Sequence, residues 1–387
     1  MAEFDLNWMI SVDDHILEPP NVWQDRVAKK YRDAAPRFVR DAQGEAWVYE
    51  GKRMPTPGLA AVAGKKVEEF SPLPITYEDM RPGCYDPKAR VADMDRAGVA
   101  ASLCFPSLPG FCAETFFKSK DHNLALACIQ AYNDWNIEEW CGVAPDRYVP
   151  LMLLPLWDAE LSAKELLRTA AKGAKAFCFT EQPHKIGLPS VYDESWEPLW
   201  AVANETRMPA CLHIGSSSHH EGDTDRFAVT PGAPAAVFVT NAPLSSFYAA
   251  SDLIWCPALA KHENLRFVMS EGGIGWVPYL LERADYTWER HRFWTQATHM
   301  KEKPSTHFRN HISVCFIDDV VGMEQRHVIG VDNILWEADY PHTDTSWPNS
   351  RAVVAKHLGH LPEDERRKIA YENAQRIFQM QPAGAPA

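Results

Sequence analysis

The chain has 387 residues, of which 46% are hydrophobic and 24% are charged, the balance of an ordinary globular protein. Its formal net charge of -13 argues against a nucleic-acid partner or an anionic membrane surface, because both need a basic face on the protein. We find no signal-peptide pattern and no apolar run near the roughly 18 residues of a transmembrane helix. The nine cysteines are scattered without a CxxC pair, so we expect buried thiols and a cytoplasmic protein.

Short apolar runs rich in β-forming residues alternate with longer helical stretches along the chain. We predict eight strands, at 9–12, 100–105, 148–154, 174–179, 210–214, 265–269, 312–317 and 333–336. Helical patterns lie between them, at 88–98, 122–141, 159–172, 196–206 and 274–293. Strands that alternate with helices in this way imply βαβ units and a parallel sheet.

Several of these strands are apolar without alternation, as strands buried on both faces should be; the run from Val149 to Leu154 is one. Eight such units fit a closed barrel better than an open doubly wound sheet, and no GxGxxG motif follows the first strand. We therefore predict an α/β fold of the (β/α)8 TIM-barrel type, forming a single domain over residues 1–387.

Two long insertions interrupt the repeating pattern, at about 26–84 after the first strand and 216–262 after the fifth. Loops that follow barrel strands lie on the catalytic face, so both insertions are candidates for lids or pocket walls. Oligomer contacts are the other interpretation of these segments. The Pro/Ala-rich tail, 379–387, is predicted to be disordered.

Polar residues stand at the C-terminal ends of four predicted strands. Asp13 and His15 follow the first strand and face one side, because alternate residues of an extended segment point the same way. His213 ends the fifth strand, Glu271 follows the sixth and Asp339 follows the eighth. Each one alone has an ordinary explanation, such as a turn, a core histidine or a helix N-terminus. Together they predict one divalent metal site, since Asp and His ligands suit Zn²⁺, Mn²⁺ or Fe²⁺.

Four segments carry a family resemblance: ISVDDHILEPP at 10–20, RVADMDRAGV at 90–99, DNILWEADYPH at 332–342 and NAQRIF at 373–378. They resemble the amidohydrolase superfamily (amidohydrolase family 2), in particular the branch related to aminocarboxymuconate semialdehyde decarboxylase and γ-resorcylate decarboxylase. The resemblance spans essentially the whole chain. It is specific to the family but not to one reaction.

The resemblance implies that His15, His213 and Asp339 are metal ligands. Asp13 stands where the family has His or Glu, so it is implied as a fourth ligand, and Asp339 is implied to move protons as well. At Glu271 the chain departs from the family, which places a catalytic His in this position. The resemblance further implies one divalent ion, for which we expect zinc with manganese or iron as alternatives, and a homodimer or homotetramer.

The departure at Glu271 bears on the reaction. A metal lowers the pKa of bound water from ~16 toward ~7, and a carboxylate such as Asp339 or Glu271 can take the proton as the water attacks. The added negative charge also opposes a substrate carboxylate, since two unpaired charges at ~4 Å and an effective dielectric of ~20 repel by ~4 kcal/mol. We therefore expect a hydrolase that acts on a small aromatic or cyclic carbonyl compound (amide, ester, lactone or C–C bond).

Non-oxidative decarboxylation of an aromatic or muconate-type carboxylic acid is the alternative, and a metal-binding barrel without activity is a second one. For both the hydrolase and the decarboxylase, the expected partner is a small-molecule substrate. The candidate pocket residues are aromatic and histidine side chains near the strand ends: His342, His219, His220, Trp276, Phe111 and Trp157. Among the histidines, His342 is the one expected to reach the pocket, because it lies three residues past Asp339.

Overall fold

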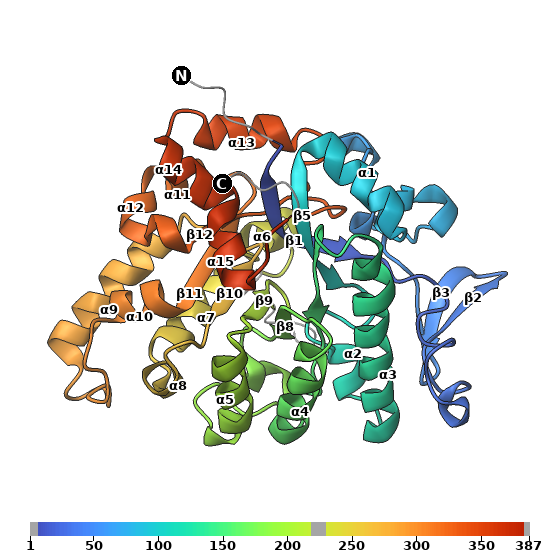
Figure 1. Ribbon diagram of the computed structural model, residues 1–387, viewed down its shortest axis with the longest axis horizontal. Coiled ribbons are helices and arrows are strands. Elements are labelled where there is room, and N and C mark those ends of the chain that lie inside the picture. The colour runs from blue at the N-terminus through green and yellow to red at the C-terminus, as the bar shows by residue number, and fades with distance from the viewer. Residues whose placement is uncertain (1–6, 218–229, 383–387) are drawn as a thin grey trace.

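The computed structural model describes residues 7–217 and 230–382. His219, His220 and the end of the predicted disordered tail therefore lie outside the described residues. Strands occupy the centre of the molecule and helices surround them (Figure 1). No helix of the described ranges has the length and apolar character needed to cross a membrane.

Parallel strands pair in chain order around a ring. β1 pairs with β5 and β5 with β6, and from β7 to β12 each strand pairs with the next. β6 and β7 are two pieces of the strand predicted at 148–154, separated at Pro150, which has no N–H to donate. The bounds are β1 (Met9–Ile16), β5 (Val99–Pro106), β6 (Tyr148–Val149), β7 (Leu151–Met152), β8 (Ala176–Phe179), β9 (Ala210–His213), β10 (Phe267–Ser270), β11 (Ile312–Phe316) and β12 (Ile334–Trp336).

The ring closes just beyond the end of β12. The Asp339 N–H donates to the carbonyl of Asp13 over 2.9 Å, and the His15 N–H donates to the carbonyl of Tyr340 over 2.6 Å. Ser11 adds a side-chain link, because its Oγ accepts from the Ala338 N–H at 2.8 Å and donates to the Asp13 carbonyl at 3.1 Å. These bonds confirm the predicted TIM barrel and exclude an open doubly wound sheet.

The predicted helices are present, with one internal difference. The helix expected over 122–141 is α-helical only over α3 (His122–Trp135) and continues as a π-helical segment, Asn136–Trp140. Asp86, Asp121 and Asp158 begin α1, α3 and α4 by accepting backbone N–H groups of the first turn. The longer helices around the barrel are α1 (Pro87–Ala97), α3 (His122–Trp135), α4 (Ala159–Ala170), α5 (Glu197–Thr206), α9 (Val277–His291), α10 (Pro304–His311) and α13 (Ser350–Leu358).

Shorter helices fill the connections between these elements. Four of them, α11 (Val320–Glu324), α12 (Arg326–Ile329), α14 (Glu363–Arg367) and α15 (Asn373–Phe378), belong to the C-terminal part of the barrel. α2 (Glu114–Phe117) follows β5 in the chain and, with its preceding loop, contributes to the site described below. The second predicted insertion carries α6 (Ala235–Asn241), α7 (Leu244–Ile254) and α8 (Pro257–Lys261).

The first predicted insertion contains a small antiparallel sheet that projects to one side of the barrel (Figure 1). Its strands are β2 (Arg37–Asp41), β3 (Gly44–Tyr49) and β4 (Lys52–Met54). Trp47 joins this sheet to the body of the protein through an edge-to-face contact with Trp23, with ring centroids 5.1 Å apart. This contact brings the end of the insertion toward the C-terminal face of the barrel strands.

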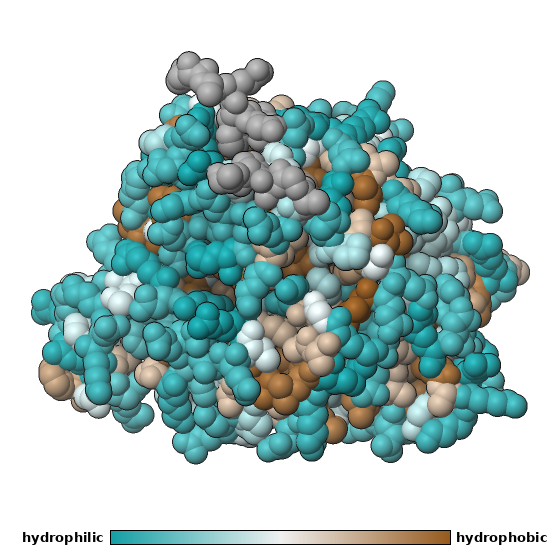
Figure 2. Space-filling model, in the orientation of Figure 1, coloured by the Kyte–Doolittle hydropathy of each residue, from teal (hydrophilic) through white to brown (hydrophobic). Residues whose placement is uncertain are grey.

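The core and surface follow the predicted composition. All nine cysteines are buried and free, in agreement with the expected thiols. Between the barrel and its helices, Trp200 packs edge to face on Phe179 and Phe267, with centroid distances of 5.0 and 5.7 Å. The outer face in Figure 2 is mostly hydrophilic, with apolar side chains gathered in small patches.

We expect Ser11→Ala to lower the free energy of unfolding by about 1–3 kcal/mol, because the buried Ala338 N–H would lose its partner at the barrel closure. Urea unfolding followed by circular dichroism measures the change. Ser162→Ala is the matched control, since Ser162 is equally buried and its Oγ has no hydrogen-bond partner in the described part of the chain. Equal losses in the two variants would contradict the role assigned to Ser11.

Candidate metal centre and active site

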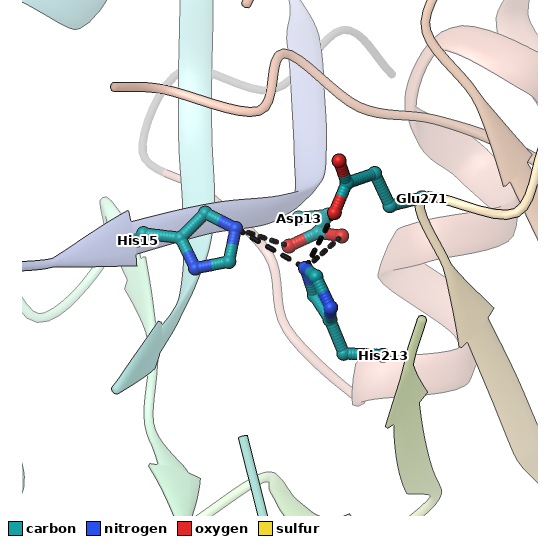
Figure 3. Close-up of side chains that lie close together, drawn as sticks. All are labelled: Asp13, His15, His213 and Glu271. Atoms are coloured by element: carbon teal, nitrogen blue, oxygen red, sulfur yellow. Dashed lines mark hydrogen bonds and ion pairs between the residues drawn. The ribbon is translucent and has the colours of Figure 1, made fainter. Parts of the chain in front are cut away.

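The ends of four barrel strands bring acidic and histidine side chains to one point. Asp13 and His15 lie on β1, and His213 is the last residue of β9. Glu271 directly follows β10, and Asp339 lies shortly after β12. Asp13, His15, His213 and Glu271 point toward one another from three different strands (Figure 3). The structure thus brings together all five residues that the sequence analysis singled out at strand ends.

Short distances connect these side chains. His213 Nε2 lies 2.9 Å from Glu271 Oε2, 3.4 Å from Asp13 Oδ2 and 3.2 Å from His15 Nε2. His15 Nε2 in turn lies 3.2 Å from Asp339 Oδ1. One ligand atom each from Asp13, His15, His213 and Glu271 lies within 4.8 Å of the others, and Asp339 joins the cluster through His15. Glu271 therefore occupies a position that suits direct metal ligation.

The cluster fits a divalent metal ion. Both carboxylate oxygens of Asp13 and of Asp339 are buried and have no hydrogen-bond partner among the described residues. A buried carboxylate without a partner is costly, and a cation between the two would offset that cost. His213 Nδ1 lies 2.7 Å from the Ile214 carbonyl, which can only accept, so Nδ1 carries the proton and the Nε2 lone pair faces the cluster.

Two of these residues have an uncommon backbone conformation. Glu271 has φ of 61° and Asp339 has φ of 52°, in the left-handed region that costs a non-glycine residue about 1–3 kcal/mol. Neighbouring bonds hold both, since the Glu271 N–H donates to Glu337 Oε2 at 3.1 Å and the Asp339 N–H donates to Asp13. Further along the same loop, Asp319 Oδ2 accepts the N–H groups of Ile274 and Gly275. Such strain is typical of functional sites.

Burial and mutual repulsion dominate the electrostatics. Burial, followed by the neighbouring carboxylates, raises the pKa of Asp13 and of Asp339 well above the ordinary range. Burial also lowers the pKa of His15. Burial acts against the charged forms of His213 and Glu271 as well, but their mutual attraction outweighs it, so the pKa of His213 is raised and that of Glu271 is lowered. A bound cation favours the carboxylate and neutral imidazole forms that ligate it.

Asp14 faces away from the cluster, as the alternation along β1 predicts, and belongs to a supporting network. It accepts the Tyr340 N–H at 2.9 Å and the hydroxyl of Ser102. The fully buried guanidinium of Arg90 donates to the His15 carbonyl at 2.5 Å and lies over the Tyr340 ring. This network holds the backbone on either side of the barrel closure.

A cleft of about 360 Å³ adjoins the cluster. Phe111 and His342 line it, and the same two rings stack on the candidate ligands: Phe111 on His213 at 3.8 Å and His342 on His15 at 3.5 Å between centroids. His342 Nδ1 is also 3.6 Å from Asp339 Oδ1. The first insertion supplies much of the remaining wall: Trp47, Met54, Thr56 and Tyr77. The described residues that line the cleft include no Lys or Arg.

Two predicted pocket residues lie elsewhere. Trp276 donates its indole N–H to the Gly272 carbonyl at 2.8 Å and packs on Phe247, and it does not line this cleft. Trp157 stacks on His122 at 4.9 Å, also outside the cleft wall. His219 and His220 fall outside the described residues. A pocket role for these four residues stays a prediction.

Four buried glutamates near the strand ends were missed by the sequence analysis. Burial raises the pKa of Glu18, Glu114 and Glu181 to about 7 and that of Glu337 to about 8. Glu181 Oε1 accepts from Ser245 and its Oε2 from the Gly215 N–H, so it joins the loops after β8 and β9. The available signal for Glu181 and Glu337 was an acid within two residues of the end of an apolar strand.

The chain is similar to known proteins over most of its length. Residues 21–380 match the family model described as Amidohydrolase. The chain is 24% identical over 350 residues to γ-resorcylate decarboxylase of Rhizobium sp. (strain MTP-10005), an alignment that covers 81% of this chain and 97% of that enzyme.

Two solved structures share the fold. An amidohydrolase of Mycobacterium avium subsp. paratuberculosis K-10 is 22% identical with a TM-score of 0.74, over 96% of this chain and 98% of that one. A 5-carboxyvanillate decarboxylase of Novosphingobium aromaticivorans DSM 12444, solved with manganese and 4-hydroxy-3-methoxy-5-nitrobenzoic acid, is 17% identical with a TM-score of 0.66. That alignment covers 96% of each chain.

We expect protein purified without added metal to carry about one divalent ion per chain, measured by plasma mass spectrometry. Chelation should lower the melting temperature, because the ion binds the folded state alone. His213→Ala should lose most of the ion, since it removes a nitrogen that faces every other member of the cluster. His311→Ala, a buried histidine outside the cluster, is the control and should keep the ion. A stoichiometric ion in His213→Ala would contradict the site.

Proposed function

Because this chain belongs to the amidohydrolase family, we propose that it is a metal-dependent decarboxylase of a small aromatic carboxylic acid. The observation that carries the proposal is the similarity to γ-resorcylate decarboxylase, which extends over 97% of that enzyme. A decarboxylase solved with manganese and a nitrobenzoic acid has the same fold. The buried Asp and His cluster next to an aromatic cleft supplies the parts that this reaction needs.

Decarboxylation without an oxidant breaks the bond between a ring carbon and the carboxyl carbon. The electron pair stays on the ring carbon, CO2 leaves, and a proton takes its place. A divalent ion, when bound, supplies positive charge that orients the substrate and stabilises negative charge as it develops. Asp13, His15, His213, Glu271 and Asp339 are the residues proposed to hold that ion. The protein itself must supply the proton donor.

Asp339 is the residue that we assign to the proton transfer. Its carboxyl group is fully buried, lies 3.2 Å from His15 Nε2 and has no hydrogen-bond partner among the described residues. His342 lies 3.6 Å from the same carboxylate and also lines the cleft, so it connects Asp339 to the bound substrate. A buried carboxyl that exchanges its proton with a neighbouring imidazole suits a general acid.

The cleft suits a single substituted ring. Its volume of about 360 Å³ lies at the lower end of the usual range for small-molecule sites. Trp47, Tyr77 and Phe111 provide flat apolar walls. A ring held between such walls also excludes water from the carbon that takes the proton.

Hydrolysis, the reaction that the sequence analysis favoured, becomes the second candidate. The repulsion argument behind it treated Glu271 as an unpaired charge, whereas its carboxylate lies 2.9 Å from His213 Nε2, among atoms that fit a cation. The observation that still favours hydrolysis is the absence of Lys and Arg from the described cleft wall, because a carboxylate substrate gains no side-chain cation there. The buried carboxyl group of Asp339 lies beside the metal-ligand cluster. This arrangement argues against the second alternative, a metal-binding barrel without activity.

The identity of the ion and the assembly belong to the proposal as well. Zinc was expected from the ligand types, and the manganese in the similar decarboxylase structure makes manganese an equal candidate. A homodimer or homotetramer, implied by the family resemblance, stays a prediction.

We expect the metal-loaded protein to release CO2 from one or more members of a panel of hydroxylated and aminated benzoic acids. The assay measures CO2 and ring product together, and runs in 18O-labelled water. Amide, lactone and diketone compounds are assayed in parallel. Incorporation of 18O into products of these neutral substrates, without CO2 from the acids, would replace decarboxylation by hydrolysis as the function.

We expect Asp339→Asn to reduce turnover by about 100-fold or more, the scale of a lost general acid, while the fold is retained. Circular dichroism and metal content are measured beside the rate, so that loss of the ion is separated from loss of the proton donor. Asp344→Asn, which changes a nearby acid outside the cluster, is the control. Near-normal turnover in Asp339→Asn with metal bound would remove Asp339 from the chemistry.

A further inference from the structure

Glu114 occupies a distinctive place in the wall of the cleft. It begins the short helix α2 (Glu114–Phe117) in the connection after β5, three residues beyond Phe111, whose ring stacks on His213. Gly110 is required for this placement, because a Cβ at that position would meet Glu114 Oε2 at 2.1 Å. The loop therefore delivers one ring to the metal cluster and one carboxyl group to the cleft.

The two oxygens of Glu114 have different surroundings. Oε2 accepts the Cys112 N–H at 3.0 Å. Oε1 is buried and has no hydrogen-bond partner in the described part of the chain, and the residue as a whole is only 7% exposed. An acceptor left without a partner in a low-dielectric site is costly, and a donor on a bound ligand would offset that cost. Burial raises the pKa of this carboxyl to about 7, in agreement with its missing partner.

Glu18 is the other acid of the cleft wall and, unlike Glu114, it has a hydrogen-bond partner for each of its two carboxylate oxygens. Its Oε1 and Oε2 accept the N–H groups of Ser107 and Leu108, each at 2.9 Å. Both oxygens are thus already used to shape the loop. Glu114 Oε1 is the carboxylate oxygen of these two acids that is buried without a hydrogen-bond partner among the described residues.

We propose that Glu114 determines substrate specificity by accepting a hydrogen bond from an O–H or N–H substituent on the substrate ring. This inference rests on the proposed function for the orientation of the ring. A substrate carboxylate is drawn to the cation site, so the opposite part of the ring lies toward the cleft wall that carries Glu114. The substrate class is then an aromatic acid with a hydroxyl or amino group remote from its carboxylate.

Isothermal titration of the manganese-loaded protein tests the inference without turnover. The ligands are benzoates that carry a hydroxyl, amino or methoxy group at C3 or C4; the methoxy group has similar size but no donor. We expect at least one donor ligand to bind about 10-fold or more tightly than its methoxy counterpart, because the methoxy group leaves Oε1 unpaired. Comparison of the hydroxyl and amino series shows which donor the site prefers.

Glu114→Gln should reverse this preference. The amide carbonyl of Gln must face the Cys112 N–H, so its NH2 group takes the place of Oε1 and turns an acceptor into a donor. We expect the preference for donor ligands to fall to about 1-fold or to invert. Thr115→Val is the matched control: Thr115 lines the same cleft, but its hydroxyl already donates to the Leu108 carbonyl at 2.8 Å, so the preference should stay.

The outcomes separate this inference from the proposed function. Equal binding of donor and methoxy ligands by the wild type, or no binding of either, overturns the role of Glu114 even if Glu114→Gln does not fold. A donor preference that persists in folded Glu114→Gln overturns it too. A donor preference that depends on Glu114, in a protein that releases no CO2 from any acid, supports the inference and rejects decarboxylation.

Discussion

The closure between β1 and β12 is the constraint on which the rest of the structure depends. Asp339 donates its backbone N–H to Asp13, and the side chains of the same two residues supply the buried carboxylates without hydrogen-bond partners. Closing the barrel therefore brings two buried carboxyl groups close to one cluster, where burial and their mutual repulsion oppose ionisation. A cation relieves this repulsion, so the stability of the barrel and the occupancy of the metal site are linked.

Further carboxyl groups lie between this closure and the cleft. Glu271 adds a carboxylate to the cluster, Glu337 accepts the Glu271 N–H behind it, and Glu18 and Glu114 lie in the cleft wall. Among the histidines of the described cluster and cleft, His213 is the one whose pKa is raised, because Glu271 outweighs the effect of burial, whereas burial lowers the pKa of His15 and of His342. In the proposed function, a substrate carboxylate would be drawn to the cation, and the remainder of the ring would then lie toward the cleft wall.

Some of the predictions depended on distances between side chains, which a sequence pattern does not give. The repulsion assigned to Glu271 assumed that its charge is unpaired, and the short contact to His213 removes that assumption. Trp276, expected near the pocket because it follows Glu271 closely, donates its indole N–H to the Gly272 carbonyl, and its pocket role stays a prediction. Glu114 was missed because its importance lies in a single oxygen without a partner, which only packing around the loop reveals.

The sequence by itself determined the barrel, the family and the strand ends that carry Asp13, His15, His213, Glu271 and Asp339. These features can be read from the sequence because they are local: the strands are apolar runs without alternation, and the polar residues follow them closely in the chain. Only the tertiary structure decided that His342 and Phe111 stack on the two histidines, and that Glu114 lines the cleft and has one buried oxygen without a partner among the described residues. Those contacts join loops from different strands, and their geometry is set by barrel closure and packing, which local sequence does not encode.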